Sequence, residues 1–370
     1  MIRILSLMSK PRGISPGQRF RLEQWEPLLL SHHGIAMDFA VFESPDLTAL
    51  LYKPGHRFVK AALLLRDTVR RNKVLALARQ YDAVVIYREA ALLGPAIYER
   101  MLARTGIPII VDFDDAIWLP AVGSVNGAFA RLRFPGKTAT ICRMAQAVVV
   151  GNSYLAAYAA RHNANVHIVP STIDLRMYKV QPPLRDESRF VVTWSGSHST
   201  LAHLETARGA LRRLGEKRRV RLRVICDRPQ DRPFEGVETE HVPWRAEVEA
   251  ATLGQTHCGI MPLPDDEYSR GKCGMKALQY MAVGRPAVLS PVGVNAEIVN
   301  NGENGLLASD EDDWVRALTA LADSNELREK LGSAGRRTVE ERFSSEIGAA
   351  GFAGAVRSAL ARAALRSQPR

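Results

Sequence analysis

The sequence predicts an α/β fold made of two Rossmann-like, doubly wound domains that face each other across a cleft. Short apolar runs alternate with longer stretches of helical periodicity, which is typical of βαβ units in a mostly parallel sheet. The alternation stops once, in the Pro-rich, mixed-charge segment from Lys179 to Ser188, and then restarts. A length of 370 residues also exceeds what one hydrophobic core usually supports.

The first domain is expected to span residues 1–178. Its strands are predicted from apolar runs at 2–8, 35–42, 82–87, 107–113, 147–150 and 166–169. Helical patterns lie between them, at 19–31, 63–80, 94–105 and 154–161. The first run is followed by Lys-Pro-Arg-Gly and lacks a cleavage-site pattern, so we expect a buried strand there and not a signal peptide.

The second domain is expected to span residues 189–345. Strands are predicted at 190–194, 220–226, 237–242, 258–263, 286–290 and 305–308. Helices are predicted at 201–214, 245–253, 276–283 and 312–322. The tail from Glu326 to Ala364 reads as helix with an interruption at 342–344, and we expect residues 346–370 to pack back toward the first domain. Ligands in open α/β sheets bind at the carboxyl ends of the strands.

Composition excludes several classes of protein. No apolar run approaches the roughly 20 residues of a membrane-spanning helix. The four cysteines are scattered without a Cys-x-x-Cys pair, which argues against a zinc site or a disulfide framework and fits a reducing cytoplasm. The net charge is +11, yet no nucleic-acid-binding motif is recognisable. We therefore expect a cytoplasmic protein that does not bind nucleic acid.

The positive charge is most concentrated between Arg57 and Arg79, which hold seven bases and one acid. Apolar residues fall near helical spacing among these bases: Phe58, Ala61, Leu64, Val69, Val74 and Leu75. A basic amphipathic helix on the inner face of the cytoplasmic membrane accounts for this pattern. A helix packed on the sheet with a basic solvent face accounts for it equally well, and both interpretations stay open here.

The turn from Gly271 to Gly274 opens the helix predicted at 276–283. Its glycines leave backbone N–H groups accessible at the helix start, and this end carries a partial positive charge suited to a diphosphate. Lys272 and Lys276 are close enough in sequence to reach the same anion. The alternative is an ordinary helix start with two solvated lysines.

Polar residues also follow the predicted strands of the first domain. The Gly- and Pro-rich turn after the first strand is suited to anions or is a basic surface turn. Its candidate residues are Arg12, Gly13, Ser15, Gly17 and Arg19, with Arg21 close behind them. Arg88 and Glu89 follow the third strand. Asp112, Asp114 and Asp115 end the fourth, where they could act as a catalytic carboxylate, clamp a magnesium ion, cap a helix or pair with arginines.

In the second domain, Gly196, Ser197 and His198 follow the first strand. Gly196 permits close backbone approach, and His198 is a candidate contact for a phosphate, although a loop histidine is more often simply solvated.

The segment 262–305, PLPDDEYSRGKCGMKALQYMAVGRPAVLSPVGVNAEIVNNGENG, resembles the family 4 retaining glycosyltransferases of GT-B architecture. Its "LQYMAVGRPAVLSPVG…EIVNNGENGLL" is similar to that family's "LEAMA-G-PVV-S-VGG--EIV--G-NG". Asn152-Ser-Tyr-Leu155 and Pro170-Ser-Thr-Ile-Asp174 resemble family motifs in the first domain. The order and spacing of these motifs agree over nearly the whole chain.

The resemblance implies a hexosyltransferase-type enzyme that moves a sugar from a nucleotide-diphosphate donor to a glycan or lipid-linked acceptor, with retention and without a metal. The first domain would then bind the acceptor and the second the donor. Donor-binding residues would be Lys272, Cys273, Gly274, Met275, Lys276 and Gln279, with Gln279 near the ribose. Asp114 or Asp115 would face the reacting centre. Work on cell-envelope polysaccharide is the expected setting.

The sequence departs from the family pattern at two positions. Gly271 and Gln279 stand where the family usually carries two glutamates. Candidate substitutes for the missing carboxylate are Asp265, Asp266, Glu267 and Glu297, or none. Two other functions therefore remain open: a nucleotide-sugar epimerase of the same architecture, and a non-catalytic binding or scaffold protein.

Overall fold

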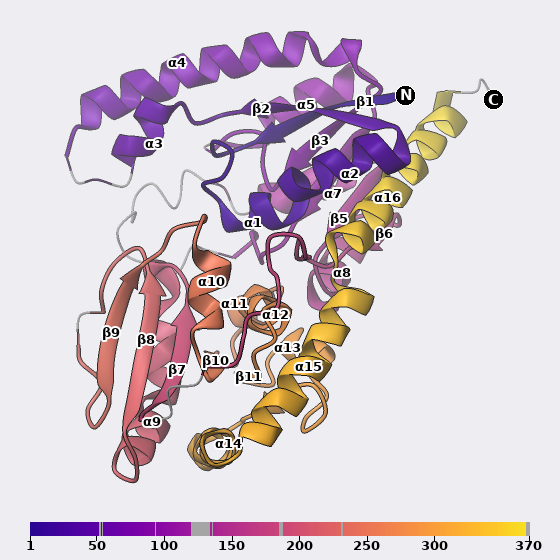
Figure 1. The fold of residues 1–370 in the computed structure, drawn as a ribbon. Coiled ribbons are helices and arrows are strands. Elements are labelled where there is room, and N and C mark those ends of the chain that lie inside the picture. Colours follow the sequence, from indigo (N-terminus) through magenta and orange to yellow (C-terminus); the bar gives the residue numbers. More distant parts are fainter. Residues whose placement is uncertain are drawn as a thin grey trace. The chain divides into compact units, whose positions relative to one another are not determined.

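The computed structural model describes residues 1–51, 53, 55–92, 94–119, 134, 136–184, 188–230 and 232–367. They form two compact units, Met1–Ser171 with Ser345–Arg370, and Thr172–Ser344 (Figure 1). Each unit holds one six-stranded sheet in which the paired strands run parallel. The predicted α/β fold with two doubly wound domains is thereby confirmed.

The sheet of the first unit has the strand order β2-β1-β3-β4-β5-β6. Its strands are β1 (Ile2–Met8), β2 (Ile35–Val41), β3 (Ala83–Tyr87), β4 (Ile109–Phe113), β5 (Ala147–Val150) and β6 (Val166–Ile168). Strands β3, β4 and β5 are buried at every position, as expected for central strands covered by helices on both faces. The predicted strands agree with these to within two residues at each end.

The helices of the first unit follow the strands in βα order. They are α1 (Pro16–Gln18), the π-helical turn η1 (Arg19–Glu23), α2 (Gln24–His33), α3 (Pro45–Leu51), α4 (Arg57–Ala76), the 3₁₀ turn η2 (Ala78–Gln80), α5 (Ile97–Arg104), α7 (Lys137–Met144), α8 (Ser153–Ala160) and α16 (Ser345–Ser367). Asn152 caps α8 by accepting a hydrogen bond of 2.9 Å from the backbone N–H of Leu155.

The C-terminal helix α16 belongs to the first unit, as predicted. Phe352 and Val356 are fully buried in the same cluster as Trp25 of α2, and the Trp25 and Phe352 rings lie 5.6 Å apart. Many core positions of α16 are alanine, which lets the helix approach its neighbours closely. The expected interruption of the tail is confirmed at Phe343 and Ser344.

The sheet of the second unit has the order β12-β11-β10-β7-β8-β9. Its strands are β7 (Phe190–Ser195), β8 (Val220–Cys226), β9 (Glu238–Pro243), β10 (Cys258–Met261), β11 (Ala287–Leu289) and β12 (Leu306–Leu307). The helices are the 3₁₀ helix η4 (His198–Ala207), α9 (Arg208–Gly215), α10 (Glu249–Gly254), α11 (Glu267–Arg270), α12 (Met275–Ala282), α13 (Asn295–Ile298), α14 (Glu311–Asp323) and α15 (Asn325–Arg342). This unit has its own core, which includes Trp194, Leu222 and Trp314.

The division between the units lies earlier than the Pro-rich segment 179–188 and the expected limits 1–178 and 189–345. The backbone N–H of Ile173 donates to the carbonyl of Phe343, and that of Gln181 donates to Val283, at 2.8 and 3.1 Å. These bonds attach the stretch from Thr172 onward to the second unit. Residues 185–187 of the expected linker lie outside the described residues.

Candidate functional site

Both sheets reverse their strand order at one point, and several of the predicted site residues follow the strands that meet there. In the first unit the reversal lies between β1 and β3, which are followed by Gly17 and Arg88. In the second it lies between β7 and β10, which are followed by Gly196 and the turn at Gly271–Gly274. Such switch points are the usual ligand sites of open α/β sheets.

Arg88 holds two of the three acids at the carboxyl edge of the first sheet. Its Nε and Nη2 atoms donate to Oδ1 of Asp114 at 2.9 and 2.7 Å, and Nη2 also donates to Oδ2 of Asp115 at 2.7 Å. The backbone of Arg88 is left-handed, with φ of 63°, a conformation that is uncommon outside glycine. Burial opposes the charge, but Asp114, Tyr87 and Asp115 outweigh burial and raise the pKa of Arg88 well above its ordinary value.

Tyr87 and Gly17 complete the surroundings of Asp114. The Tyr87 hydroxyl donates to Oδ1 of Asp114 at 2.7 Å, and burial raises the pKa of Tyr87 well above its ordinary value, so the hydroxyl keeps its proton. A Cβ atom at Gly17 would lie 2.0 Å from the Tyr87 oxygen and 2.3 Å from Oδ2 of Asp114. Only glycine therefore lets the start of α1 rest on this pair. Asp114 is almost buried, whereas Asp115 is partly exposed.

Asp112, the third acid, has a structural partner. Arg21 donates to both of its carboxylate oxygens, at 2.7 and 3.2 Å, and to the carbonyl of Val169 at 2.7 Å. Both side chains are fully buried. Of the interpretations left open for the three acids, pairing with arginines is the one the structure shows. Within the described ranges, no group of three or more His, Cys, Asp or Glu side chains is arranged to hold a metal ion.

The other predicted residues of the first domain have separate contacts. Arg12 pairs with Glu26 and lies 4.5 Å from the centroid of the Phe39 ring. The backbone N–H of Gly13 donates to Glu23, Ser15 precedes α1 in an extended conformation, and Arg19 lies over the Phe20 ring. Glu89 forms an ion pair of 2.7 Å with Lys137. The structure thus joins Gly17 and Arg88 to Asp114, while Arg12 makes its contacts elsewhere.

In the second unit, the turn that opens α12 requires glycine at 274. Gly274 has φ of +68°, and a Cβ atom there would lie 2.3 Å from Cδ1 of Ile298. Cys273 is buried and Met275 is the first residue of α12. The first N–H groups of an α-helix have no partner within the helix. The expected helix start is therefore present, and it is fixed in place by packing against α13.

Two lysines and one histidine gather around this turn. The Nζ atom of Lys272 lies 4.0 Å from the centroid of the Tyr268 ring, and that of Lys276 lies 5.4 Å from the Trp194 ring. His203 on η4 is close enough to feel both charges: burial, then Lys276, then Lys272 lower its pKa to about 4. A Cβ atom at Gly196 would lie 3.0 Å from Cε of Lys276, so this glycine also borders the group. The arrangement produces a positive potential suited to an anion.

His198 is held by an acid and is not merely solvated. Its Nδ1 atom lies 2.6 Å from Oδ2 of Asp227, and its backbone N–H donates to Oδ1 at 2.7 Å. Burial acts to raise the pKa of Asp227, but the hydrogen bonds from His198 outweigh it and lower the pKa. Ser197 precedes η4, and its hydroxyl lies 2.8 Å from that of Ser199.

Gln279 is buried inside the second unit. Its Nε2 atom donates to the Tyr178 hydroxyl at 2.9 Å, which donates to Glu249 at 2.6 Å. The expected ribose contact of Gln279 stays a prediction. Two of the acids considered as substitutes for the missing glutamate also have local partners, because Asp265 pairs with Arg270 and Asp266 caps α11.

Four residues at these edges were not predicted from the sequence: Tyr87, Lys137, His203 and Asp227. Asp227 follows the strand predicted at 220–226 and Tyr87 ends the strand predicted at 82–87. Reading strand ends more completely would have found both. His203 and Lys137 lie inside helices, and only the folded structure brings them to the sites.

A comparison with protein-family models finds a match within the second unit. Residues 189–324 match the family model described as glycosyl transferases group 1. This segment of the second unit is similar to a group 1 glycosyltransferase domain. The matched segment contains the turn at Gly271–Gly274, all of α12 and the His198–Asp227 pair. A comparison with curated protein sequences finds no match.

Solved structures resemble the chain along almost its whole length. Sucrose-phosphate synthase from Thermosynechococcus elongatus has a TM-score of 0.72 at 16% identity, covering 97% of this chain and 99% of the other. The Anabaena protein HepE in complex with UDP and glucose has a TM-score of 0.64 at 14% identity, covering 97% and 100%. A putative UDP-N-acetylglucosamine 2-epimerase from Listeria monocytogenes has a TM-score of 0.57 at 13% identity, covering 100% and 98%.

The similarity to these structures extends through both units, so the expected GT-B fold is confirmed. At such low identities they show the fold alone. The family match supplies the activity: the glycosyltransferase predicted from the motifs at 262–305 is confirmed.

Proposed function

We propose that this glycosyltransferase moves a sugar from a nucleotide-diphosphate donor to a glycan or lipid-linked acceptor, with retention at the anomeric carbon. The observation that carries the proposal is the family match over residues 189–324, which contains the glycine turn with Lys272, Lys276 and the neighbouring His203. A diphosphate needs positive charge and open N–H donors, and a helix start beside Lys272 and Lys276 supplies both.

The proposed step depends on stabilising charge in the departing group. The bond between the anomeric carbon and the diphosphate oxygen breaks, and its electron pair leaves with the diphosphate. Backbone N–H groups at the start of α12 and the Lys272 ammonium would hold this charge. The acceptor hydroxyl oxygen forms the new bond on the same face of the sugar, and its proton passes to the departing diphosphate oxygen. In this proposal no metal ion is required, so chelation leaves the rate unchanged.

The first unit would bind the acceptor. Asp114 and Asp115 are the proposed catalytic carboxylates, which would steady positive charge on the reacting sugar. Arg88 and Gly17 would keep them in place. A cytoplasmic enzyme of cell-envelope polysaccharide synthesis is the setting that we propose.

A panel of nucleotide sugars tests this function. UDP-glucose is a natural first member, because HepE has been crystallised with it. A donor at 100 times its dissociation constant should stabilise the protein by about 2.7 kcal/mol, which thermal unfolding detects readily. Donor hydrolysis or transfer should follow, and the anomeric configuration of the product reports retention. If no member of the panel binds or is turned over, the proposal fails.

An epimerase is the second candidate. The His198–Asp227 pair supplies a histidine oriented by a carboxylate at the same sheet edge as the basic side chains, which is a plausible arrangement for moving a proton. Incubation of a nucleotide sugar without any acceptor separates the two functions. An epimerase would yield an isomeric nucleotide sugar, whereas a transferase would return the donor or its hydrolysis products.

A further inference from the structure

Helix α4 carries two apolar stripes on opposite faces, and only one of them packs against the first unit. From sequence spacing alone, Phe58, Leu64, Val69 and Leu75 were expected to share one stripe. The structure divides them: Leu64 and Leu75 face the unit, whereas Phe58 and Val69 point outward. The long helix is seen at the top of Figure 1.

The inner face of α4 packs against the first unit and forms hydrogen bonds with it. Arg71 is buried and donates to the carbonyls of Ala40 and Met8 at 3.0 and 2.9 Å. Asp67 is also buried and accepts a hydrogen bond of 2.8 Å from the backbone N–H of Ser44. These contacts, beside which Leu63 and Leu64 pack, fix the helix to the ends of β1 and β2.

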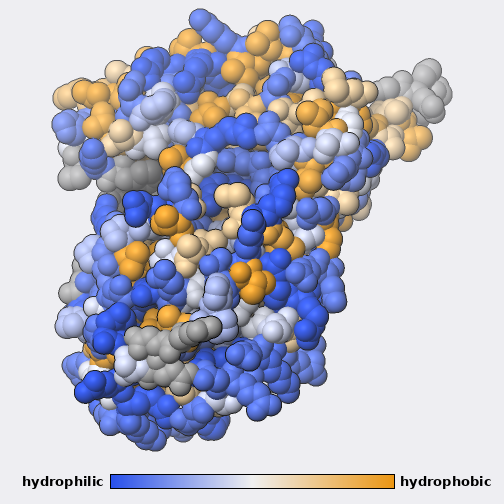
Figure 2. All heavy atoms as spheres, in the orientation of Figure 1, coloured by the Kyte–Doolittle hydropathy of each residue, from blue (hydrophilic) through white to orange (hydrophobic). Residues whose placement is uncertain are grey.

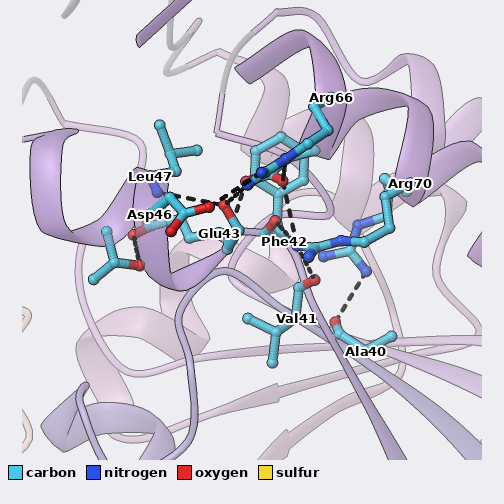
Figure 3. Close-up of polar contacts among 12 residues, drawn as sticks. Ala40, Val41, Phe42, Glu43, Asp46, Leu47, Arg66 and Arg70 are labelled. Carbon is cyan, nitrogen blue, oxygen red and sulfur yellow. Dashed lines mark hydrogen bonds and ion pairs between the residues drawn. The ribbon is translucent and has the colours of Figure 1, made fainter. Parts of the chain in front are cut away.

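Two further arginines form an ion pair and hydrogen bonds at the edge of this face. Figure 3 shows Arg66 and Arg70 reaching toward the end of β2 and the start of α3. Arg66 pairs with Asp46 at 3.1 Å, and Arg70 donates to the carbonyls of Val41 and Phe42. Part of the positive charge seen in the sequence therefore has a structural role. Both side chains still remain about half exposed, with 51% and 45% of their surface accessible.

The apolar side chains on the outer face of α4 are exposed and do not pack against the first unit. Phe58 is 92% exposed, Leu65 66% and Val69 49%. With the exposed Ala62 and Ala76 they follow the spacing of a single helix face. Scattered apolar residues are normal on a protein surface, but an aligned row with a fully exposed phenylalanine marks an interaction site. Figure 2 shows hydrophobic and hydrophilic atoms interspersed along this top edge.

The charged residues near Phe58, Leu65 and Val69 indicate which kind of partner binds this row of apolar side chains. Arg57, Lys73 and Arg79 are exposed along the helix and the turn that follows it. The only acid between residues 57 and 79 is Asp67, which is buried. A second copy packed through the same face would bring these bases together, because a two-fold contact places a patch against itself. An anionic surface instead meets complementary charge.

We infer that the outer face of α4 binds the surface of an anionic lipid bilayer. Phe58, Leu65 and Val69 would enter the boundary between headgroups and acyl chains, while the neighbouring bases contact lipid phosphates. The helix would lie parallel to the membrane. The inference rests on α4 alone and does not depend on the proposed glycosyl transfer. Within the described residues, no helix is long and apolar enough to cross a membrane.

Vesicle flotation of the full chain tests this inference. The vesicles consist of phosphatidylcholine alone or of phosphatidylcholine mixed with phosphatidylglycerol. The wild-type protein should float with the mixed vesicles only, and less so at high salt. Leu65→Glu should weaken partitioning by about tenfold or more, since it puts a carboxylate into the apolar row.

Leu30→Glu is the matched control. Leu30 is a 52% exposed leucine on α2, so the substitution makes the same change in charge at a position outside the row. It should bind vesicles as the wild type does. Phe58→Ser, at a side chain with almost no packing to lose, should reproduce the Leu65→Glu defect with an unchanged melting temperature.

Three results would overturn the inference. The wild type could fail to float with either vesicle, or the two glutamate variants could bind equally. Alternatively, sedimentation velocity could show self-association that Leu65→Glu abolishes, with no vesicle binding by the wild type. That last result would assign the face to a second copy of the chain.

Discussion

Arg88 shows how a single side chain can organise the carboxyl edge of a parallel sheet. Its left-handed backbone turns the guanidinium back toward β4, where it meets Asp114 and Asp115 together. Like charges crowded at a strand end repel one another unless a cation compensates. Here one arginine compensates two carboxylates, and Gly17 leaves the space that the arrangement requires.

Gly17→Ala should disturb this arrangement directly. The new methyl group would overlap the Tyr87 hydroxyl and the Asp114 carboxylate, which must then move. Such overpacking typically costs about 1–3 kcal/mol of stability, measurable by urea unfolding. Gly354→Ala on α16 is the control, because a Cβ atom there meets nothing within 4 Å. Equal stability losses for the two variants would contradict the proposed close approach.

The pKa of His203 depends on the charges that surround it. Burial and the two lysines lower its pKa from 6.5 to about 4, so the folded protein resists protonation more than the unfolded chain does. The contribution of His203 to stability is therefore complete above pH 6.5 and is lost as the pH falls toward about 4. A bound diphosphate would offset the lysine charges.

We therefore expect saturating UDP to raise the pKa of His203, measured by NMR titration of the imidazole. Lys276→Ala should raise it as well, since it removes the larger of the two lysine effects. His162 of the first unit should not respond to UDP. A His203 pKa that stays near 4 in saturating UDP would place the diphosphate elsewhere.

Only part of this residue-level detail could be predicted from the sequence. The strand-end rule located Arg88, Asp114 and Asp115 because parallel strands present their carboxyl ends at one edge, and the glycine turn before the predicted helix located Lys272. It could not decide which arginine would pair with which acid. That choice depends on where Arg21 and Arg88 lie in three dimensions.

At the scale of elements, buried polar pairs tie helices to the sheets. Arg21 joins the π-helical turn η1 to β4 through Asp112 and to the end of β6 through Val169. A buried ion pair is stabilising only while both partners are present, because an unpaired buried charge is costly.

Asp112→Asn should therefore destabilise the protein by about 3–5 kcal/mol in chemical denaturation. Asp38→Asn is the comparison, since its pair with Arg3 is exposed and such pairs contribute about 0–1 kcal/mol. The structural assignment of Asp112 would be wrong if both variants lost the same small amount.

Most elements were predictable because their apolar patterns are strong. The expected strands at 2–8, 147–150 and 220–226 match residue for residue. The helical pattern was placed at 63–80, whereas the basic amphipathic pattern already included Phe58 and began at Arg57, where α4 begins. The sequence could not show which of its apolar residues face the unit and which face outward, because both sets follow helical spacing.

At the scale of the whole molecule, each unit has a separate core. The core of the first unit includes α16, although this helix follows the second unit in sequence. Phe352→Ala should destabilise the first unit by about 3–5 kcal/mol by leaving a cavity beside Trp25. Hydrogen exchange should then show faster opening of β3 and β4, with unchanged protection of β7 and β8. Uniform loss across both sheets would contradict independent cores.

The division into two domains was predictable from the sequence, because strands and helices alternate in each half of the chain. The position of the boundary between the domains was not predictable. The Pro-rich segment 179–188 had the composition of a linker, yet backbone hydrogen bonds from Ile173 and from Gln181 within that segment attach the chain from Thr172 onward to the second unit. Composition identifies residues that tolerate exposure. It does not show which unit supplies their hydrogen-bond partners.

The central claim is that the edge formed by Lys272, Lys276 and the start of α12 binds the diphosphate of a sugar donor. Calorimetric titration with UDP and a panel of nucleotide sugars tests it most directly. The wild type should bind at least one donor, and Lys272→Ala combined with Lys276→Ala should weaken binding by about tenfold or more. Lys217→Ala, an exposed lysine elsewhere in the unit, should bind like the wild type. Equal affinity of the double variant and the wild type would contradict the claim.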